Sequence, residues 1–377
     1  MLEADILIIG MGPAGATAAL NLAPLRRVLV VERRAEPGDR IGESLAPAAR
    51  RLLADMGLWA DFMRDGHAPC YAVRSAWGSP APTERDSLAD LDGHGWHLNR
   101  MRFEARLRAT AVARGACLLA PARVTGLARS GASWAVRLEH GGRAMVASAP
   151  IVLDCGGRTS ALLKPFGAER RSRDRLICGW VYGGMALERS PGLIYTESAP
   201  DGWWYTAPMA DGRRVLAWHT DADLSAAAIV RDRAALLEKA GRSPTLAAEI
   251  ADAAFAGDNP PRVIAAHSSI LTPSVGEGWL AAGDAALSFD PLASQGLFHA
   301  LYTGLAAAEA IDRALSGDVS ALAGYASALA RIDSAYRQNL GAWYGLERRW
   351  PDEEFWRRRL PLAPSDRSTN SPWFAGI

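Results

Sequence analysis

The stretch that decides the fold is Asp5-Ile6-Leu7-Ile8-Ile9-Gly10-Met11-Gly12-Pro13-Ala14-Gly15. It joins an apolar run of strand length to the pattern Gly-x-Gly-x-x-Gly, and an alanine-rich segment of helical length follows at residues 16–26. A second apolar run, Val28 to Val31, then ends in the acidic residue Glu32. This order of strand, glycine turn, helix, strand and acid is typical of a Rossmann unit that binds a dinucleotide.

Each residue type in this stretch has a physical role at a dinucleotide. Gly10 allows the tight turn, Gly12 lets the backbone approach a pyrophosphate, and Gly15 lets the helix pack closely on the strand. The start of the helix supplies free N–H donors, and Glu32 is placed to accept hydrogen bonds from ribose hydroxyls. The residues predicted at this site are Gly10, Gly12, Pro13, Ala14, Gly15, Glu32 and Arg33.

Composition excludes several function classes. The chain has 377 residues, 49% of them hydrophobic, which is enough for two closely joined globular domains. A net charge of +1 gives no electrostatic case for nucleic acid or an anionic membrane as a partner. The four cysteines are scattered without metal-ligand spacing, and no apolar run reaches membrane-spanning length. We therefore expect a reduced, cytoplasmic protein with no metal site.

Two further motifs follow the first in a fixed order. One is Ile151-Val152-Leu153-Asp154-Cys155-Gly156-Gly157-Arg158-Thr159-Ser160, and the other combines Gly283-Asp284-Ala285-Ala286 with residues 290–297. Together the three motifs resemble those of the FAD-dependent aromatic hydroxylases and their relatives, the FAD halogenases. The resemblance covers nearly the whole chain, and it implies FAD as the cofactor.

The resemblance also assigns residues to the flavin. It implies that Asp284 binds the ribityl chain, that Arg100 approaches the phosphate and ribityl region, and that the loop 291–297 presents backbone N–H groups to the pyrimidine edge. A helix N-terminus at this loop would stabilise the negative charge of reduced flavin. Glu43-Ser44 either contacts the flavin or caps the next helix. The other positions expected near FAD are Arg40, Gly42, Val124, Gly283, Pro291, Ser294, Gln295, Gly296 and Leu297.

This resemblance implies an α/β fold, α+β overall. Segments 1–68, 98–165 and 263–320 are expected to form a discontinuous, Rossmann-type FAD-binding domain. Within it we expect a β-meander from Val124 to Val146 with Gly141-Gly142 as a hairpin turn, and a long alanine-rich helix at residues 296–315. Segments 69–97 and 166–262 are expected to form an inserted antiparallel-sheet substrate domain, as in aromatic hydroxylases, with residues 174–224 as strands and residues 225–257 as helices. Residues 321–377 are expected to form a helical C-terminal segment, with its arginines 357–359 as a solvated helix end.

Some segments of the sequence resemble those of the halogenase branch of this superfamily. Residues 42–47 look like its Gly-Glu-Ser segment, and Asp201 to Pro208 is a variant of its Trp-x-Trp-x-Ile-Pro signature. Halogenases also need a lysine near residues 71–77 and a glutamate before the flavin-loop serine. Here Arg74 is the only cation in that stretch, and Ala293 stands in place of the glutamate. Because a guanidinium does not readily form a haloamine, we expect hydroxylation rather than halogenation.

A closer resemblance is to the flavoprotein maturases of quinone-cofactor amine oxidases, the partners of lysine oxidase, glycine oxidase and quinohaemoprotein amine dehydrogenase. The matching segments are Gly42 to Leu45, residues 201–208 with 218–223, the loop 290–296, and 347–358. This implies hydroxylation of a tryptophan in a peptide or protein precursor, such as an amine oxidase, through a flavin C4a-hydroperoxide. The cosubstrates would be O₂ and NAD(P)H, or a partner flavin reductase in place of NAD(P)H.

Aromatic hydroxylation needs an apolar pocket that orients the ring and a group that removes its proton. His97 and His219 are candidates for the proton acceptor, although a hydrogen-bonded sheet histidine is an equal alternative, and Tyr205 is a further catalytic candidate. The residues expected to line the pocket are Arg74, Trp77, Trp203 and Trp204, with ordinary core packing as the alternative for each tryptophan. Three other functions stay open: hydroxylation of a free small aromatic, halogenation, and a flavoprotein chaperone of a partner oxidase.

Overall fold

The computed structural model describes residues 2–87, 92–185 and 192–360. Its centre is a six-stranded sheet in which the neighbouring strands at residues 6–9 and 28–31 are buried along almost their whole length, as their unbroken apolar runs dictate. Five of its strands are parallel and the edge strand β22 is antiparallel. The order is β22 (Val275–Gly276), β23 (Trp279–Ala281), β13 (Ile151–Asp154), β2 (Ile6–Ile9), β3 (Val28–Val31) and β9 (Cys117–Leu119).

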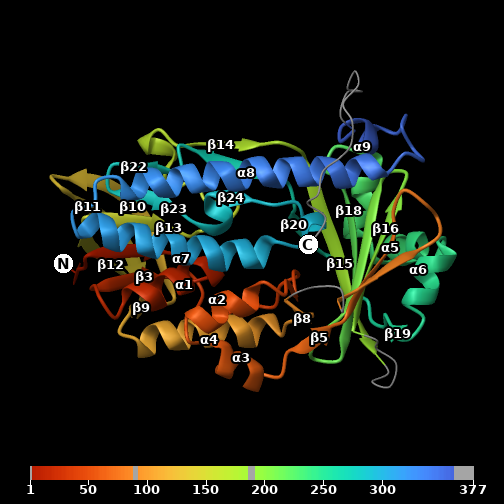
Figure 1. Cartoon of the computed structure of the whole chain (residues 1–377), viewed down its shortest axis with the longest axis horizontal. Coiled ribbons are helices and arrows are strands. Elements are labelled where there is room, and N and C mark those ends of the chain that lie inside the picture. Colours follow the sequence, from red (N-terminus) through yellow and green to blue (C-terminus); the bar gives the residue numbers. More distant parts are fainter. Residues whose placement is uncertain (1, 88–91, 186–191, 361–377) are drawn as a thin grey trace.

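Helices cover this sheet. The first of them, α1, packs against both α4 and α7, so the glycine turn at its start lies among three long helices (Figure 1). This arrangement confirms the predicted Rossmann-type unit, and α7 has the bounds expected from the sequence. The helices of this part are α1 (Pro13–Leu22), α2 (Ala49–Asp55), α3 (Trp59–Arg64), α4 (Arg100–Ala113) and α7 (Gly296–Leu315).

A β-meander flanks the Rossmann unit. Gly141 and Gly142 join two of its strands with φ angles of 56° and 73°, the left-handed pair that a two-residue hairpin turn requires. The predicted meander and its turn are therefore confirmed. Its sheet has the order β1 (Leu2–Glu3), β12 (Arg143–Ala149), β11 (Ser133–His140) and β10 (Ala122–Ser130).

The largest sheet has eight strands and stands beside the Rossmann unit (Figure 1). Most of its pairs are antiparallel, but β16 runs parallel to β6, which comes from the earlier segment 69–97. Its order is β19 (Ala253–Ala254), β15 (Leu176–Met185), β18 (Arg213–Asp221), β17 (Gly202–Pro208), β16 (Leu193–Ala199), β6 (Ala72–Ala76) and β7 (Thr83–Asp86), with β20 (Arg262–Ala265) paired to β15.

Two small sheets connect these parts. One joins β4, directly after Glu43, to β8 and β5, so segment 69–97 also reaches the Rossmann unit. The other lies beneath the C-terminal helices. Their strands are β4 (Ser44–Leu45), β8 (Gly95–His97) and β5 (Ala68–Cys70), then β14 (Glu169–Ser172), β21 (Ser269–Thr272) and β24 (Leu287–Ser288).

The two faces of the eight-stranded sheet carry different helices. Residues 225–257, expected to be helical, form a 3₁₀ segment at 225–231, α5 (Arg233–Gly241) and α6 (Pro244–Glu249), and they cover one face. On the other face lie the end of α8 (Ala321–Leu346) and α9 (Glu354–Arg357). Figure 1 shows α8 extending from the Rossmann unit to this sheet. The predicted helical tail is confirmed for α8 and α9, while residues 361–377 lie outside the described residues.

None of the helices in the described ranges is long and apolar enough to cross a membrane. Within the same ranges, no three His, Cys, Asp or Glu side chains are grouped so that they could hold a metal ion. All four cysteines are free, and only Cys117 is exposed.

Candidate functional site: a flavin cradle beside an aromatic cluster

The three glycines of the first turn differ in what surrounds them. Gly10 has a φ of +96°, and a Cβ there would lie 2.4 Å from the carbonyl oxygen of Cys155. A Cβ at Gly15 would lie 1.9 Å from the carbonyl oxygen of Gly10, whereas one at Gly12 would meet nothing within 4 Å. Two glycines are thus required by packing, and the third faces open space where a pyrophosphate could approach. Helix α1 begins there at Pro13, with no side chain capping its N–H groups.

Glu32 lies at the end of β3, beside this turn. Its Oε2 accepts a hydrogen bond from the backbone N–H of Met11 at 2.7 Å, and its Oε1 accepts one from that of Arg34 at 3.0 Å. Each carboxylate oxygen keeps a lone pair for another donor, so the position still suits a ribose hydroxyl. Arg33, by contrast, is exposed.

Buried arginines gather next to the turn. Arg100 donates from Nη1 to the carbonyl oxygen of Gly42 at 2.5 Å and from Nη2 to Glu104 at 2.5 Å. Arg108 donates from Nε to the carbonyl oxygen of Met11 at 2.9 Å. Its Nη2 is buried without a hydrogen-bond partner among the described residues. Burial, together with the positive charge of Arg100, lowers the pKa of Arg40. Two carboxylates already lie beside these three arginines, Glu104 at 2.5 Å from Arg100 and Glu32 at 3.9 Å from Arg108 Nη2, and a pyrophosphate would balance the remaining positive charge.

Arg108 is a residue that our sequence analysis missed. It lies on α4 at a spacing of four from Glu104 and eight from Arg100, so the three share one face of the helix. That spacing is the signal that could have identified it.

One half of the flavin cradle is formed by the glycine turn, Glu32, residues 40–43 and the arginine group. The other half is formed by the motifs at 283 and 290. Gly283 has a φ of +59° and donates its N–H to Thr303 of α7 at 2.9 Å. Asp284, next to it, is about one-third exposed and lies 3.5 Å from Arg158. Helix α7 then begins at Gly296 with no side chain capping its first N–H groups, and a Cβ at Gly296 would meet nothing within 4 Å.

The remaining positions expected at FAD lie on β10 and in the turn before α7. Val124 lies at an irregularity of β10 and packs against the core of the Rossmann unit. Pro291 begins the 3₁₀ turn Pro291–Ala293, Ser294 has a left-handed φ of 51°, and Gln295 and Leu297 flank the first residue of α7. An open glycine turn, arginine N–H groups that have no hydrogen-bond partner among the described residues, and an uncapped helix N-terminus fit the pyrophosphate and the ring edge of FAD.

Glu43 connects the cradle to the eight-stranded sheet. It is fully buried, and its Oε1 accepts a hydrogen bond from the hydroxyl of Tyr205 at 2.7 Å. Its Oε2 accepts another from the backbone N–H of Gly42 at 2.9 Å. Burial raises the pKa of Glu43, and burial and the carboxylate raise that of Tyr205. The helix-capping alternative for Glu43-Ser44 is wrong, because Ser44 is in β4 and α2 begins after Ala48 with no side-chain cap.

An aromatic cluster lies on the same face of the sheet as Tyr205. Trp77 packs edge-on against Trp203 and Trp356, with ring centroids 6.4 and 5.4 Å apart. Ile41, two residues before Glu43, and Leu292 of the flavin loop both pack against this cluster. Two strand residues that sequence reasoning missed, Trp180 and Tyr182, also belong to it. Segments from both halves of the cradle therefore meet one aromatic surface.

Trp204 and Arg74 do not reach that surface. Trp204 packs against Trp218 on the α5 face, with ring centroids 4.7 Å apart. Arg74 forms ion pairs with Glu84 at 2.7 Å and with Glu249 of α6 at 2.6 Å. Because side chains alternate across a strand, neighbouring tryptophans point to opposite faces. The prediction that Trp204 and Arg74 line the pocket with Trp203 is wrong.

The two candidate histidines are buried. His219 stacks on Trp203 with centroids 3.6 Å apart, and burial lowers its pKa to about 3. Burial lowers the pKa of His97, which pairs with Ser44 across β8 and β4, to about 4. Both rings are neutral at pH 7 and are weak proton acceptors where they lie. The hydrogen-bonded alternative does not describe His97 either, because neither of its ring nitrogens has a hydrogen-bond partner among the described residues.

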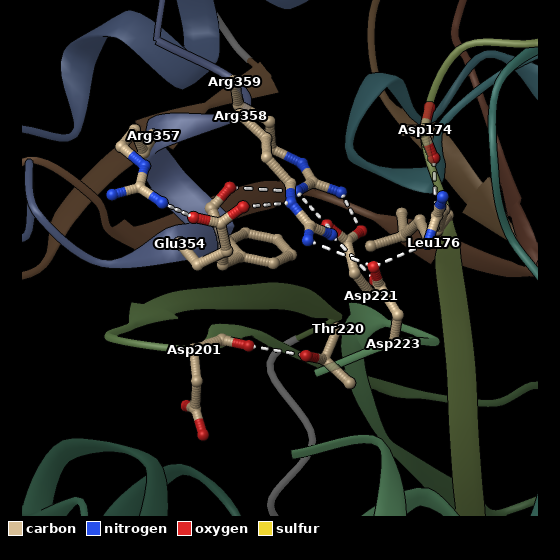
Figure 2. Close-up of polar contacts among 12 residues, drawn as sticks. Asp174, Leu176, Asp201, Thr220, Asp221, Asp223, Glu354, Arg357, Arg358 and Arg359 are labelled. Atoms are coloured by element: carbon tan, nitrogen blue, oxygen red, sulfur yellow. Dashed lines mark hydrogen bonds and ion pairs between the residues drawn. The ribbon is translucent and has the colours of Figure 1, made fainter. Parts of the chain in front are cut away.

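The C-terminal arginines differ from the expected solvated helix end. Arg359 is only 7% exposed in its side chain and pairs with Asp221 of β18 at 2.5 Å. Arg358 pairs with Asp221 at 3.1 Å and with Asp223 at 2.7 Å (Figure 2). Arg357 and Arg358 are both exposed, and Arg357 pairs with Glu354. The expectation is therefore wrong for Arg359, whose side chain is buried against Asp221, and incomplete for Arg358, which is exposed but held by the acids at the end of β18.

Known proteins share this sequence and architecture. The family model described as "FAD binding domain" matches residues 3–332. LodB of Marinomonas mediterranea, named as an FAD-dependent oxidoreductase, is 30% identical over 370 residues, which cover 94% of this chain and 96% of LodB. The myxobacterial chondrochloren halogenase CndH superposes with a TM-score of 0.85 at 27% identity, covering 97% of this chain and 87% of CndH. The peptidyl tryptophan dihydroxylase QhpG, at 24% identity, superposes with a TM-score of 0.74 over 95% of this chain and 78% of its own.

Proposed function

The chain belongs to the family of FAD binding domain proteins as an FAD-dependent oxidoreductase, and we propose that it is a monooxygenase that hydroxylates an electron-rich aromatic ring. The observation that carries this proposal is the aromatic cluster around Trp203, against which both Ile41 and Leu292 of the flavin cradle pack. A substrate ring placed there would lie between the flavin and a wall of apolar side chains.

Such surroundings suit oxygen transfer to a ring. Reduced flavin and O₂ together supply an electrophilic oxygen. If water reaches the site, this oxygen is lost as hydrogen peroxide before it can be transferred to the ring. The chain's contribution is to exclude that water and to orient the ring with large apolar side chains. Glu43 and Tyr205 provide a buried polar pair at the junction, with the tyrosine proton held toward Glu43 Oε1.

Halogenation is the second candidate, because the halogenase CndH is similar over most of its length. The position of the lysines argues against it. The sequence contains two, Lys164 and Lys239. Lys239 pairs with Asp201 at 2.8 Å and lies over Trp218 on the α5 face, while Lys164 is exposed in the 3₁₀ turn Lys164–Phe166. Neither amine is on the face that carries Trp203, so a haloamine could not form beside the cluster.

We assign a tryptophan side chain within a peptide or protein precursor as the substrate. The support is the resemblance of residues 42–45, 201–208 and 347–358 to the maturases of quinone-cofactor amine oxidases. The peptidyl tryptophan dihydroxylase QhpG, essential for tryptophylquinone cofactor biogenesis, has the same fold, so this fold admits such a substrate. Electrons would come from NAD(P)H or from a partner flavin reductase.

The test is product analysis by mass spectrometry. The FAD-loaded protein is mixed with O₂, bromide and either NAD(P)H or chemically reduced FAD, and it is offered a tryptophan-containing peptide or a free indole. The proposal requires that the peptide gain one or two oxygen atoms. A bromine isotope pattern would establish halogenation instead, and oxygen on the free indole alone would establish a small-molecule hydroxylase. The variant Gly12→Ala, which should not hold FAD, is the negative control.

A further inference from the structure

The loop that begins α7 is held from outside the Rossmann unit. Its first residue, Asp290, is buried, and its Oδ1 accepts a hydrogen bond from the backbone N–H of Leu292 at 2.9 Å. Four residues later, Ser294 has a φ of 51°, a left-handed conformation that L-amino acids other than Asn and Asp seldom adopt. A conformation of this kind persists only where neighbouring groups enforce it.

Two tyrosines of α8 provide that enforcement. The hydroxyl of Tyr344 donates to Asp290 Oδ2 at 2.7 Å, and the backbone N–H of Asp290 donates to the hydroxyl of Tyr336 at 2.7 Å. The ring of Tyr336 also stacks on Phe289, with centroids 4.1 Å apart, and Phe289 in turn contacts His299 in the first turns of α7. Helix α8 therefore holds the loop directly at Asp290, before the strained residue, and through Phe289 it is linked to the start of α7 after that residue.

Tyr344 is itself held by the end of the described chain. The guanidinium of Arg359 lies 5.3 Å from the ring centroid of Tyr344 and 3.8 Å from that of Phe355. Its two terminal nitrogens bind both oxygens of Asp221 at 2.5 and 3.0 Å, which Figure 2 shows beside the parallel contacts of Arg358. This bidentate geometry fixes the guanidinium on β18, so it is a rigid backing for the tyrosine.

From these contacts we propose that the C-terminal helices are part of the flavin site: Tyr336 and Tyr344 are positioning residues that fix the loop 290–297 through Asp290, and Arg359 fixes Tyr344. The proposal rests on the FAD site and not on the choice of substrate. It assigns to α8 and α9 a role in cofactor retention, although neither helix belongs to the glycine turn or to the arginine group.

The decisive variant is Tyr344→Phe, which removes one hydroxyl and keeps the ring. Its matched control is Tyr195→Phe, since the hydroxyl of Tyr195 likewise donates to a carboxylate, Glu197, at 2.5 Å, but on β16 of the eight-stranded sheet. FAD affinity is measured without substrate by fluorescence titration of the purified apoprotein, with the visible flavin spectrum and the melting temperature alongside. We expect Tyr344→Phe to weaken FAD binding by about tenfold and Tyr195→Phe to leave it unchanged.

A second pair of variants covers the case in which Tyr344→Phe does not fold. Arg359→Lys keeps the charge but loses the bidentate contact with Asp221, and Arg357→Lys makes the same change at an exposed position. Weaker FAD binding in Arg359→Lys alone supports the proposal. Unchanged FAD affinity and flavin spectrum in both Tyr344→Phe and Arg359→Lys would overturn it, whatever happens to the melting temperature. Because no turnover is measured, failure of the proposed hydroxylation would leave this result unaffected.

Discussion

Tyr205 of the eight-stranded sheet donates a hydrogen bond to Glu43 of the flavin cradle over 2.7 Å, with both groups buried. Tyr205→Phe would leave a buried carboxylate oxygen without its donor, so we expect the free energy of unfolding to fall by about 1–3 kcal/mol. Glu43→Gln should lower it as well, and the double variant should cost less than the sum of the two. Urea unfolding of the wild type, the two single variants and the double variant measures the coupling energy between Tyr205 and Glu43. Strictly additive effects would show that this hydrogen bond does not stabilise the junction.

Two glycines of one motif should respond oppositely to the same substitution. Gly12→Ala places a methyl group in open space, so the apoprotein should fold with a free energy of unfolding within about 0.5 kcal/mol of the wild type and lose FAD affinity at least about tenfold. Gly10→Ala places a methyl group 2.4 Å from a carbonyl oxygen at a left-handed φ, so folding itself should fail. Thermal melts and FAD titration separate the two. Tight FAD binding by Gly12→Ala would contradict the placement of the pyrophosphate.

Substitutions of the two adjacent tryptophans of β17 should have different effects on substrate turnover. Trp203→Phe changes the cluster beside the cradle, so we expect a higher KM for the aromatic substrate, together with a loss of stability of about 1–3 kcal/mol because Trp203 is as buried as Trp204. Trp204→Phe changes only the α5 face, where the cost is a core cavity of about 1–3 kcal/mol with kcat/KM retained. Steady-state kinetics together with urea unfolding test this. If the two substitutions changed the kinetics equally, the substrate would not be bound on the face of the sheet that carries Trp203.

Asp290 should make stability depend on pH. Burial raises the pKa of its carboxyl from 3.8 to about 6. Between those values the folded protein keeps a proton that the unfolded chain has released, so the free energy of unfolding should fall as the pH rises from 3.8 to about 6, by up to about 3 kcal/mol. Asp290→Asn cannot titrate, and this part of the pH dependence should vanish in it. Parallel curves of unfolding free energy against pH for the two proteins would contradict the shift.

The sequence pattern predicted those parts of the site whose structure depends on interactions between residues close together in the chain. The strand and the glycine turn at residues 5–15 follow from hydrophobic run length and the need for a left-handed φ at Gly10. The first helix was expected at residues 16–26 and instead spans Pro13–Leu22, because a proline is favoured in the first turn of a helix. The bounds of α7 were predicted as residues 296–315 from its alanine-rich composition. In these segments the residues that specify the structure are neighbours in sequence.

What could not be predicted depends on partners far away along the chain. The face of β17 that contacts Glu43 is fixed by the pairing of Trp204 with Trp218 and by the helices behind them, and no pattern within Trp203-Trp204-Tyr205 reveals it. Arg359 and Asp221 are likewise brought together by tertiary structure, so the arginine run looked like a solvated end. The hydrogen bond between Tyr344 and Asp290 left no sequence signal that we recognised.

The parallel pairing of β13 with β23 means that β13 is synthesised long before one of its two partner strands. Strand β13 ends at Asp154, but the strand that covers its outer edge ends at Ala281. While the intervening residues leave the ribosome, one edge of β13 has no partner strand, and the first three of its four residues are apolar, which is the kind of edge that promotes aggregation. Slower translation or co-expressed chaperones should therefore raise the yield of soluble recombinant protein more than an excess of riboflavin in the medium.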